Sequence, residues 1–132
     1  MLLADDPATA ITQFQAGALD PAQFRHCDHV RLAFEMLRRA PFPAVAADYA
    51  AGLQRLAARA GRPEAYHETI TIAFLSVVAE RLLADESDDF AGFAAAHPDL
   101  FDKALLARWY GPARLGSAAA RRVFLLPEPC RP

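Results

Sequence analysis

The fold is decided by residues 43–84, PAVAADYAAGLQRLAARAGRPEAYHETITIAFLSVVAERLLA. Each half of this stretch begins with a proline, and Gly61 lies between the halves. Proline is favoured at the first position of a helix and glycine just after the last, so this punctuation matches two consecutive helices. Within both halves apolar residues recur at steps of three and four, which is the period of a helix with one buried face. We therefore predict helices over about residues 43–60 and 63–84.

The same punctuation extends the helical pattern to both sides. Asp20 and the proline after it match a helix N-cap and first residue, which predicts a helix over residues 21–40, or one that restarts near Asp28. Proline, serine and glycine residues mark shorter helices elsewhere. These run over about residues 7–16, 87–96, 100–110 and 117–124. The expected fold class is all-α, a compact helical bundle of about six or seven helices.

Length and composition agree with this fold. A chain of 132 residues has the usual size of one domain, so we expect a single helical domain over residues 1–132. Alanine, the residue with the best helix propensity, occurs 30 times, and the β-branched residues form no alternating run. Only residues 126–132 are expected to form an irregular tail, because three prolines interrupt them.

Charge and hydropathy exclude two classes of partner. The net charge is −2 with both signs interspersed, whereas a dedicated nucleic-acid-binding domain usually carries a basic excess. No apolar stretch approaches the roughly 20 residues that a bilayer requires, and the N-terminus has no basic segment followed by an apolar one. We therefore expect a soluble, cytoplasmic protein with neither nucleic acid nor membrane as a partner.

Three of the four histidines occur where predicted helices begin. His26 and His29 are three residues apart, so they share one face of the helix that contains them. His67 lies near the start of the helix predicted from residue 63 and is in phase with its apolar stripe. If successive helices alternate in direction, the two helices run parallel and their first turns meet at one end of the bundle. This geometry predicts that the three imidazoles converge.

Converging imidazoles suit two kinds of site. Three histidine nitrogens with an open fourth position form a donor set for a divalent metal, zinc or iron, so His26, His29 and His67 are the candidate metal ligands. Alternatively, the same rings act as acid and base on a small metabolite. Tyr66 and Thr71 lie on either side of His67 in the sequence, and we expect them at the edge of the same ligand-binding site.

A structural interpretation of the histidines stands beside this one. Buried polar side chains are usually hydrogen-bonded, often to backbone carbonyls, and a histidine engaged in this way needs no ligand. If the helix restarts at Asp28, His26 lies in the turn before it and the shared face is weakened. The chain would then be a non-catalytic accessory or protein-interaction module, and a homodimer is one form that it would take.

Four segments carry a resemblance to known proteins. Residues 24–31 (FRHCDHVR), 66–71 (YHETIT), 105–110 (LLARWY) and 121–127 (RRVFLLP) resemble a family of small, uncharacterised bacterial helical proteins. The resemblance covers most of the chain and implies a compact helical fold, but it implies no activity, cofactor or substrate. Two functions follow from the sequence: a small-molecule-binding protein or small enzyme with a histidine-lined site, or an interaction module.

Overall fold

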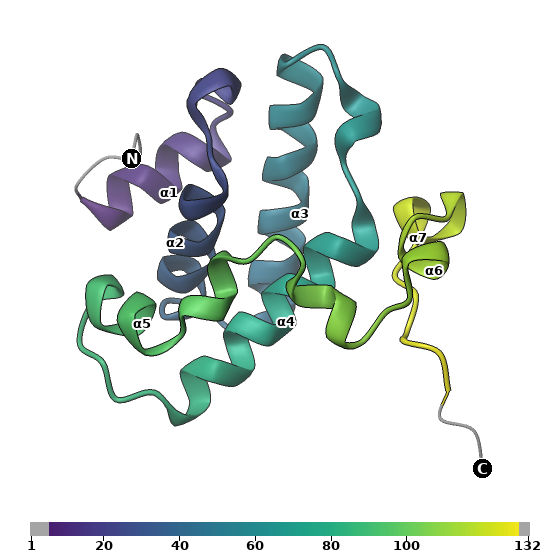
Figure 1. Ribbon diagram of the computed structural model, residues 1–132. Coiled ribbons are helices and arrows are strands. Elements are labelled where there is room, and N and C mark those ends of the chain that lie inside the picture. Colours follow the sequence, from purple (N-terminus) through teal and green to yellow (C-terminus); the bar gives the residue numbers. More distant parts are fainter. Residues whose placement is uncertain (1–5, 130–132) are drawn as a thin grey trace.

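The computed structural model describes residues 6–129, and within this range the chain is helical with no residue in a strand (Figure 1). Its α-helices are α1 (Pro7–Gln15), α2 (His26–Leu37), α3 (Phe42–Arg59), α4 (Glu68–Ala84), α5 (Phe90–Ala96), α6 (Pro112–Leu115) and α7 (Ala118–Arg122). Short 3₁₀ helices lie between them: η1 (Pro21–Gln23), η2 (Pro63–Ala65), η3 (Pro98–Phe101) and η4 (Leu105–Arg108). None of the helices described has both the length and the hydropathy needed to cross a membrane. The predicted all-α fold is confirmed.

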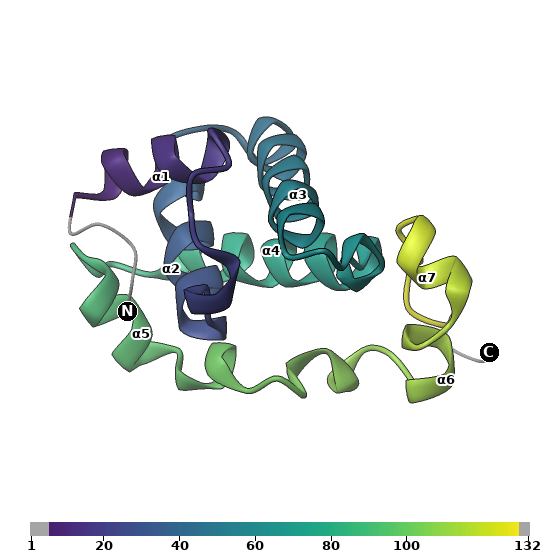
Figure 2. The same cartoon turned by 90° about the horizontal axis from the view of Figure 1, so that it is seen from above.

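The core lies where α1 to α5 meet. Among its fully buried side chains are Phe34 of α2, Tyr49 of α3 and Leu75 of α4. Leu100 of η3 and Leu105 of η4 belong to the same core. In both views α1 and α5 lie at one end of the molecule, and α6 and α7 lie at the other (Figures 1 and 2). Helices α2 and α4, which carry the predicted site, contact each other in this core.

Helix α1 packs on α3 at a glycine. Phe14 of α1 is buried, and its ring occupies the space where a side chain at Gly52 would begin. A Cβ atom at Gly52 would lie under 3.0 Å from several Phe14 ring atoms, which real Cβ atoms essentially never do. Phe14 also faces Phe24 and Tyr49, with ring centroids 6.2 and 6.0 Å away. Glycine is unfavourable within a helix, and here it permits the close approach of α1.

Helix α2 begins later than the proline pattern predicts. Pro21 opens the 3₁₀ helix η1, and the residue after η1 is extended, so the helix does not continue. A new helix starts at His26, where the Asp28 carboxylate accepts a hydrogen bond from the Arg25 backbone N–H at 3.0 Å. The prediction of one helix from residue 21 is wrong, and the alternative of a restart is closer to the structure. Both histidines of this segment lie inside the restarted helix.

Helix α4 also begins late, and its N-cap is a histidine. Pro63 opens η2, and α4 follows only at Glu68. His67 is extended, with φ −135° and ψ 109°, and its Nδ1 accepts a hydrogen bond from the Ile70 backbone N–H at 3.1 Å. An acceptor at the N-cap satisfies one of the N–H groups that a helix start leaves without a partner. The prediction that His67 lies on the helix face is therefore wrong.

The chain after α5 contains less α-helix than predicted. Residues 100–110 do not form one helix, because Asp102 is extended and its carboxylate accepts a hydrogen bond from the Ala104 N–H at 2.9 Å. This contact turns the chain between η3 and η4. Residues 124–129 have no regular structure, and residues 130–132 of the predicted tail lie outside the described residues.

Polar side chains hold residues 115–125, which we call the C-terminal segment, on the start of α4. The Thr69 hydroxyl donates to the Val123 carbonyl at 2.8 Å and accepts from the Leu125 N–H at 3.0 Å. His67 Nε2 donates to the Leu115 carbonyl at 2.7 Å. Both side chains are buried. Two members of the YHETIT motif thus bind backbone groups that would otherwise lack partners.

Candidate functional site

Three of the five predicted site residues line one cavity, which has a volume of about 100 Å³. They are His26 and His29 of α2 and Thr71 of α4. The rest of the wall comes from α3, α4, η4 and the turn before η4. It consists of Tyr49, Leu53, Ile70, Phe74, Asp102, Lys103, Leu105 and Leu106. The starts of α2 and α4 therefore share one cavity, although the chain between them is long.

His26 and His29 belong to a row of aromatic rings. The His29 ring centroid lies 4.5 Å from that of Phe24 and 6.3 Å from that of His26. The His26 ring centroid lies 5.8 Å from that of Phe74 in α4. Phe24 in turn faces Phe14 at 6.2 Å. Rings packed closely against their neighbours have few alternative rotamers, so the packing holds both imidazoles in place.

The His26 ring is oriented by a backbone carbonyl. Its Nε2 lies 3.1 Å from the carbonyl oxygen of Leu100 in η3. A carbonyl only accepts hydrogen bonds, so Nε2 carries the proton, and in the neutral ring Nδ1 is then an acceptor. Within residues 6–129, Nδ1 has no hydrogen-bond partner. His26 thus presents an acceptor nitrogen whose tautomer is set by the contact with η3.

The His29 imidazole is neutral at physiological pH. The pKa of His29 is lowered from 6.5 to about 4, chiefly by burial and in addition by the neighbouring His26, while Asp28 opposes the change. In the described part of the chain neither ring nitrogen has a hydrogen-bond partner. Among the described residues, Asp28 Oδ1 is the only polar side-chain atom that is fully enclosed and has no hydrogen-bond partner. The two His29 nitrogens also have no partner, so neither of them is fully enclosed. His29 therefore offers the cavity one N–H donor and one acceptor nitrogen.

We expect His29 to titrate near pH 4 and the stability of the protein to depend on it. An unfolded histidine binds a proton near pH 6.5, whereas folded His29 binds one only near pH 4, so the unfolded state holds more protons between these values. The free energy of unfolding therefore decreases as the pH falls from about 6.5 to about 4. Urea unfolding across this range measures the decrease, and ring-proton NMR assigns the pKa. In His29→Gln the free energy of unfolding should decrease less over this pH range. A measured His29 pKa above 6 in the wild type would contradict the burial of this ring.

Tyr66 does not line the cavity, although its hydroxyl lies beside Thr71, which does. Its hydroxyl donates to the Glu68 carboxylate. Burial, followed by this hydrogen bond, raises the pKa of Tyr66 well above its ordinary value, and the Thr71 side chain beside it opposes the rise. Thr71 donates its own hydroxyl to the His67 carbonyl at 2.7 Å, so its oxygen acts toward the cavity as an acceptor.

His67 does not join the other two histidines. Its Nδ1 accepts from the Ile70 N–H and its Nε2 donates to the Leu115 carbonyl, so both ring nitrogens are occupied. Across residues 6–129 no three His, Cys, Asp or Glu side chains are placed to hold a metal ion together. The three histidines predicted as ligands of zinc or iron are therefore not brought together in the described structure. The reason is that His67 caps α4 and binds the C-terminal segment instead.

Sequence reasoning missed the cavity residues that lie far along the chain from the histidines. The Tyr49 hydroxyl donates to the His29 carbonyl at 3.1 Å. Asp102 and Lys103 lie at the exposed edge of the cavity. For Lys103 the sequence contained one signal, because this residue is the only lysine in the chain. No periodic pattern links it to the histidines, because its turn reaches them only through tertiary packing.

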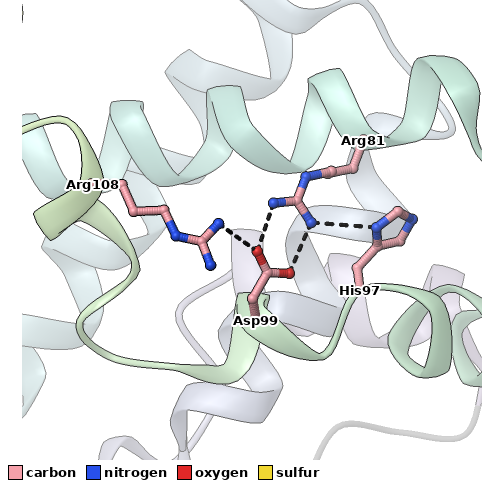
Figure 3. A network of polar contacts seen from close by, with 4 residues as sticks. All are labelled: Arg81, His97, Asp99 and Arg108. Carbon is pink, nitrogen blue, oxygen red and sulfur yellow. Dashed lines mark hydrogen bonds and ion pairs between the residues drawn. The ribbon is translucent and has the colours of Figure 1, made fainter.

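A second polar cluster joins α4 to η3 and η4. Arg81 of α4 donates to both oxygens of Asp99 at 2.8 and 2.7 Å, and Arg108 donates to the same carboxylate at 2.9 Å (Figure 3). The Arg81 guanidinium, with Arg108, holds the pKa of Asp99 well below its usual range. Arg81 also donates to His97 Nδ1 at 3.3 Å, so His97 Nε2 donates to Asp85 at 2.7 Å. These groups bind one another, and the cluster anchors the turns that form one side of the cavity.

Comparison with protein-family models, with curated proteins and with solved structures finds no match for this chain. The resemblance of its motifs to small bacterial helical proteins therefore stays a prediction. The function is inferred from the cavity alone.

Proposed function

We propose that this chain binds a small organic molecule in the cavity lined by His26, His29 and Thr71. Ligand sites in proteins are mostly apolar concave surfaces with a few converging polar groups, and this cavity has that composition. The observation that carries the proposal is His29, a neutral imidazole in the cavity wall without a hydrogen-bond partner among the described residues. Neither nitrogen is fully enclosed, so a molecule that enters the cavity can hydrogen-bond to both the donor and the acceptor of this ring.

The polar groups and the volume define what such a ligand offers. His26 Nδ1 and the Thr71 oxygen are acceptors, and His29 presents one donor and one acceptor. Acceptors outnumber donors, so a ligand with at least one O–H or N–H group fits best. The volume of about 100 Å³ is below the roughly 150 Å³ of an apolar cavity that holds benzene, so the enclosed part is no larger than one ring. An acid–base reaction on the ligand would use the same nitrogens.

Binding of uncharged fragments tests the proposal. Phenol and 4-hydroxybenzamide each carry a hydroxyl donor on one ring, and ring-proton NMR follows His26 and His29 during the titrations. We expect saturable shifts of both histidines, with dissociation constants on the order of 1 mM, as so few atoms allow. No saturable shift with either fragment would disprove the proposal.

Three variants separate binding in the cavity from binding elsewhere. His29→Gln removes an imidazole, and Leu53→Phe fills the cavity while leaving both imidazoles in place, so each should weaken phenol binding at least tenfold. Gln54→Phe introduces phenylalanine at an exposed position of α3 that does not line the cavity, and it should bind phenol as the wild type does. Amide NMR spectra report whether each variant is folded. Wild-type affinity in both folded cavity variants would place the fragments at another site.

A further inference from the structure

The exposed edge of the cavity, which we call its mouth, carries a cation. Lys103 lines the cavity and is exposed, and no carboxylate in the described part of the chain forms an ion pair with it. The adjacent Asp102 carboxylate lies at the same edge; its Oδ1 accepts the Ala104 N–H at 2.9 Å and stabilises the turn, and as an acceptor it offers a ligand no donor. The Lys103 ammonium is therefore the charged donor available to a ligand at this edge.

The polar groups inside the cavity present mainly acceptors to a ligand. His29 is neutral because burial holds its pKa near 4. His26 donates its Nε2 proton to the Leu100 carbonyl, and Thr71 donates its hydroxyl to the backbone. An anionic group placed inside would face mainly acceptors and would lose its hydration, which is strongly unfavourable without an ionic partner. A carboxylate on the ligand is therefore stable at the mouth and unstable inside.

We infer that the ligand of this cavity is a compact hydroxycarboxylic acid. Its hydroxyl end donates to His26 or Thr71, its apolar body lies among the leucine and phenylalanine side chains, and its carboxylate meets Lys103 at the mouth. This inference rests on the proposed function and adds the chemical class of the ligand. It follows from the different character of the two ends of the cavity, which is rich in acceptors inside and carries the Lys103 ammonium donor at the mouth.

A pair of probes that differ only in charge tests it. 4-Hydroxybenzoate and 4-hydroxybenzamide have the same size and the same hydroxyl, and only the first carries a carboxylate. At low salt we expect the acid to bind about fivefold more tightly, the gain of one exposed ion pair, and high salt should remove the difference. Lys103→Gln should remove the preference. Arg62→Gln, which neutralises an exposed cation that does not line the cavity, should retain it.

The orientation of the acid is read from the histidines. A carboxylate that entered first would pair with protonated His29, raise its pKa and bind more tightly as the pH falls from about 6.5 to about 4. With the carboxylate at the mouth, we expect the pKa of His29 to stay near 4 in the complex. A His29 pKa that rises on binding 4-hydroxybenzoate would overturn the inferred orientation.

Failure of the inference and failure of the proposed function give different results. If 4-hydroxybenzamide binds as tightly as 4-hydroxybenzoate, or if Lys103→Gln keeps the preference for the acid, the inference is overturned and the proposed function stands. If neither probe binds the wild type, both are overturned.

Discussion

Gly52→Val is expected to lower the free energy of unfolding by about 3 kcal/mol, the upper end of the usual cost of overpacking a core. Any Cβ atom at Gly52 lies under 3.0 Å from the Phe14 ring. Phe14 is only 1% exposed, and its ring cannot move without displacing Phe24 or Tyr49. The clash therefore has to be relieved by separating α1 from α3. Urea unfolding followed by circular dichroism measures the loss.

Two further variants isolate the cause. Ala47→Val introduces the same side chain at an exposed position of α3 and should cost less than about 1 kcal/mol, the difference in helix propensity. Phe14→Leu removes ring atoms from the contact. In the double variant, the loss should be smaller than the sum of the single losses by about 1 kcal/mol or more. Additive losses would show that the two residues do not compete for the same space.

Gly52→Val should also change the packing at the cavity. Phe24 lies between Phe14 and His29, with ring centroids 6.2 and 4.5 Å away respectively. A displaced Phe14 ring changes the packing around Phe24 and hence around the His29 imidazole. We therefore expect the His29 ring signals to shift in Gly52→Val, although Gly52 does not line the cavity.

Thr69→Val is expected to lower the free energy of unfolding by about 2–3 kcal/mol. Valine has nearly the shape of threonine, so packing is retained, but the hydroxyl that serves Val123 and Leu125 is lost. Thr69 is 0% exposed, so no water replaces the hydroxyl at this position. The Leu125 N–H and the Val123 carbonyl then lose their partner. Urea unfolding measures the loss, and hydrogen exchange should show faster opening of residues 118–125.

Thr69→Ser is the matched control for this prediction. Serine keeps the hydroxyl and loses one methyl group, so we expect a loss of about 1 kcal/mol and normal hydrogen exchange in residues 118–125. Equal losses in Thr69→Val and Thr69→Ser would show that the hydroxyl does not hold the C-terminal segment. Because Thr71 lies half a turn further along α4, detachment of this segment should also alter the cavity wall.

The fold class was predictable because helix periodicity is a local property. Apolar residues at steps of three and four place α2, α3 and α4 along the chain before any tertiary contact is known. The start of α4 was predicted too early, at residue 63, and that of α2 was predicted either too early, at residue 21, or slightly late, near Asp28. A proline opens an α-helix and a 3₁₀ turn with the same φ angle, so the pattern cannot tell them apart.

The candidate site was predictable in part, for the same reason. Spacing alone places His26 and His29 on one face, and both rings line the cavity. His67 was misplaced because its role depends on a carbonyl 48 residues away, at Leu115. The structural interpretation, a histidine bound to a backbone carbonyl, therefore describes His67 and also His26 Nε2, whereas neither ring nitrogen of His29 has a partner among the described residues. The homodimer stays a prediction.

The sequence by itself determined the helical class, the apolar faces of the long helices and the pairing of two histidines, since each depends on neighbours within one or two turns. Tertiary structure decided which histidine leaves the group and which residues close the cavity. The Leu100 carbonyl that sets the His26 tautomer and the Lys103 ammonium at the mouth come from a turn more than 70 residues away. Contacts of that range arise only when burial of the shared core brings the segments together, and no local pattern encodes them.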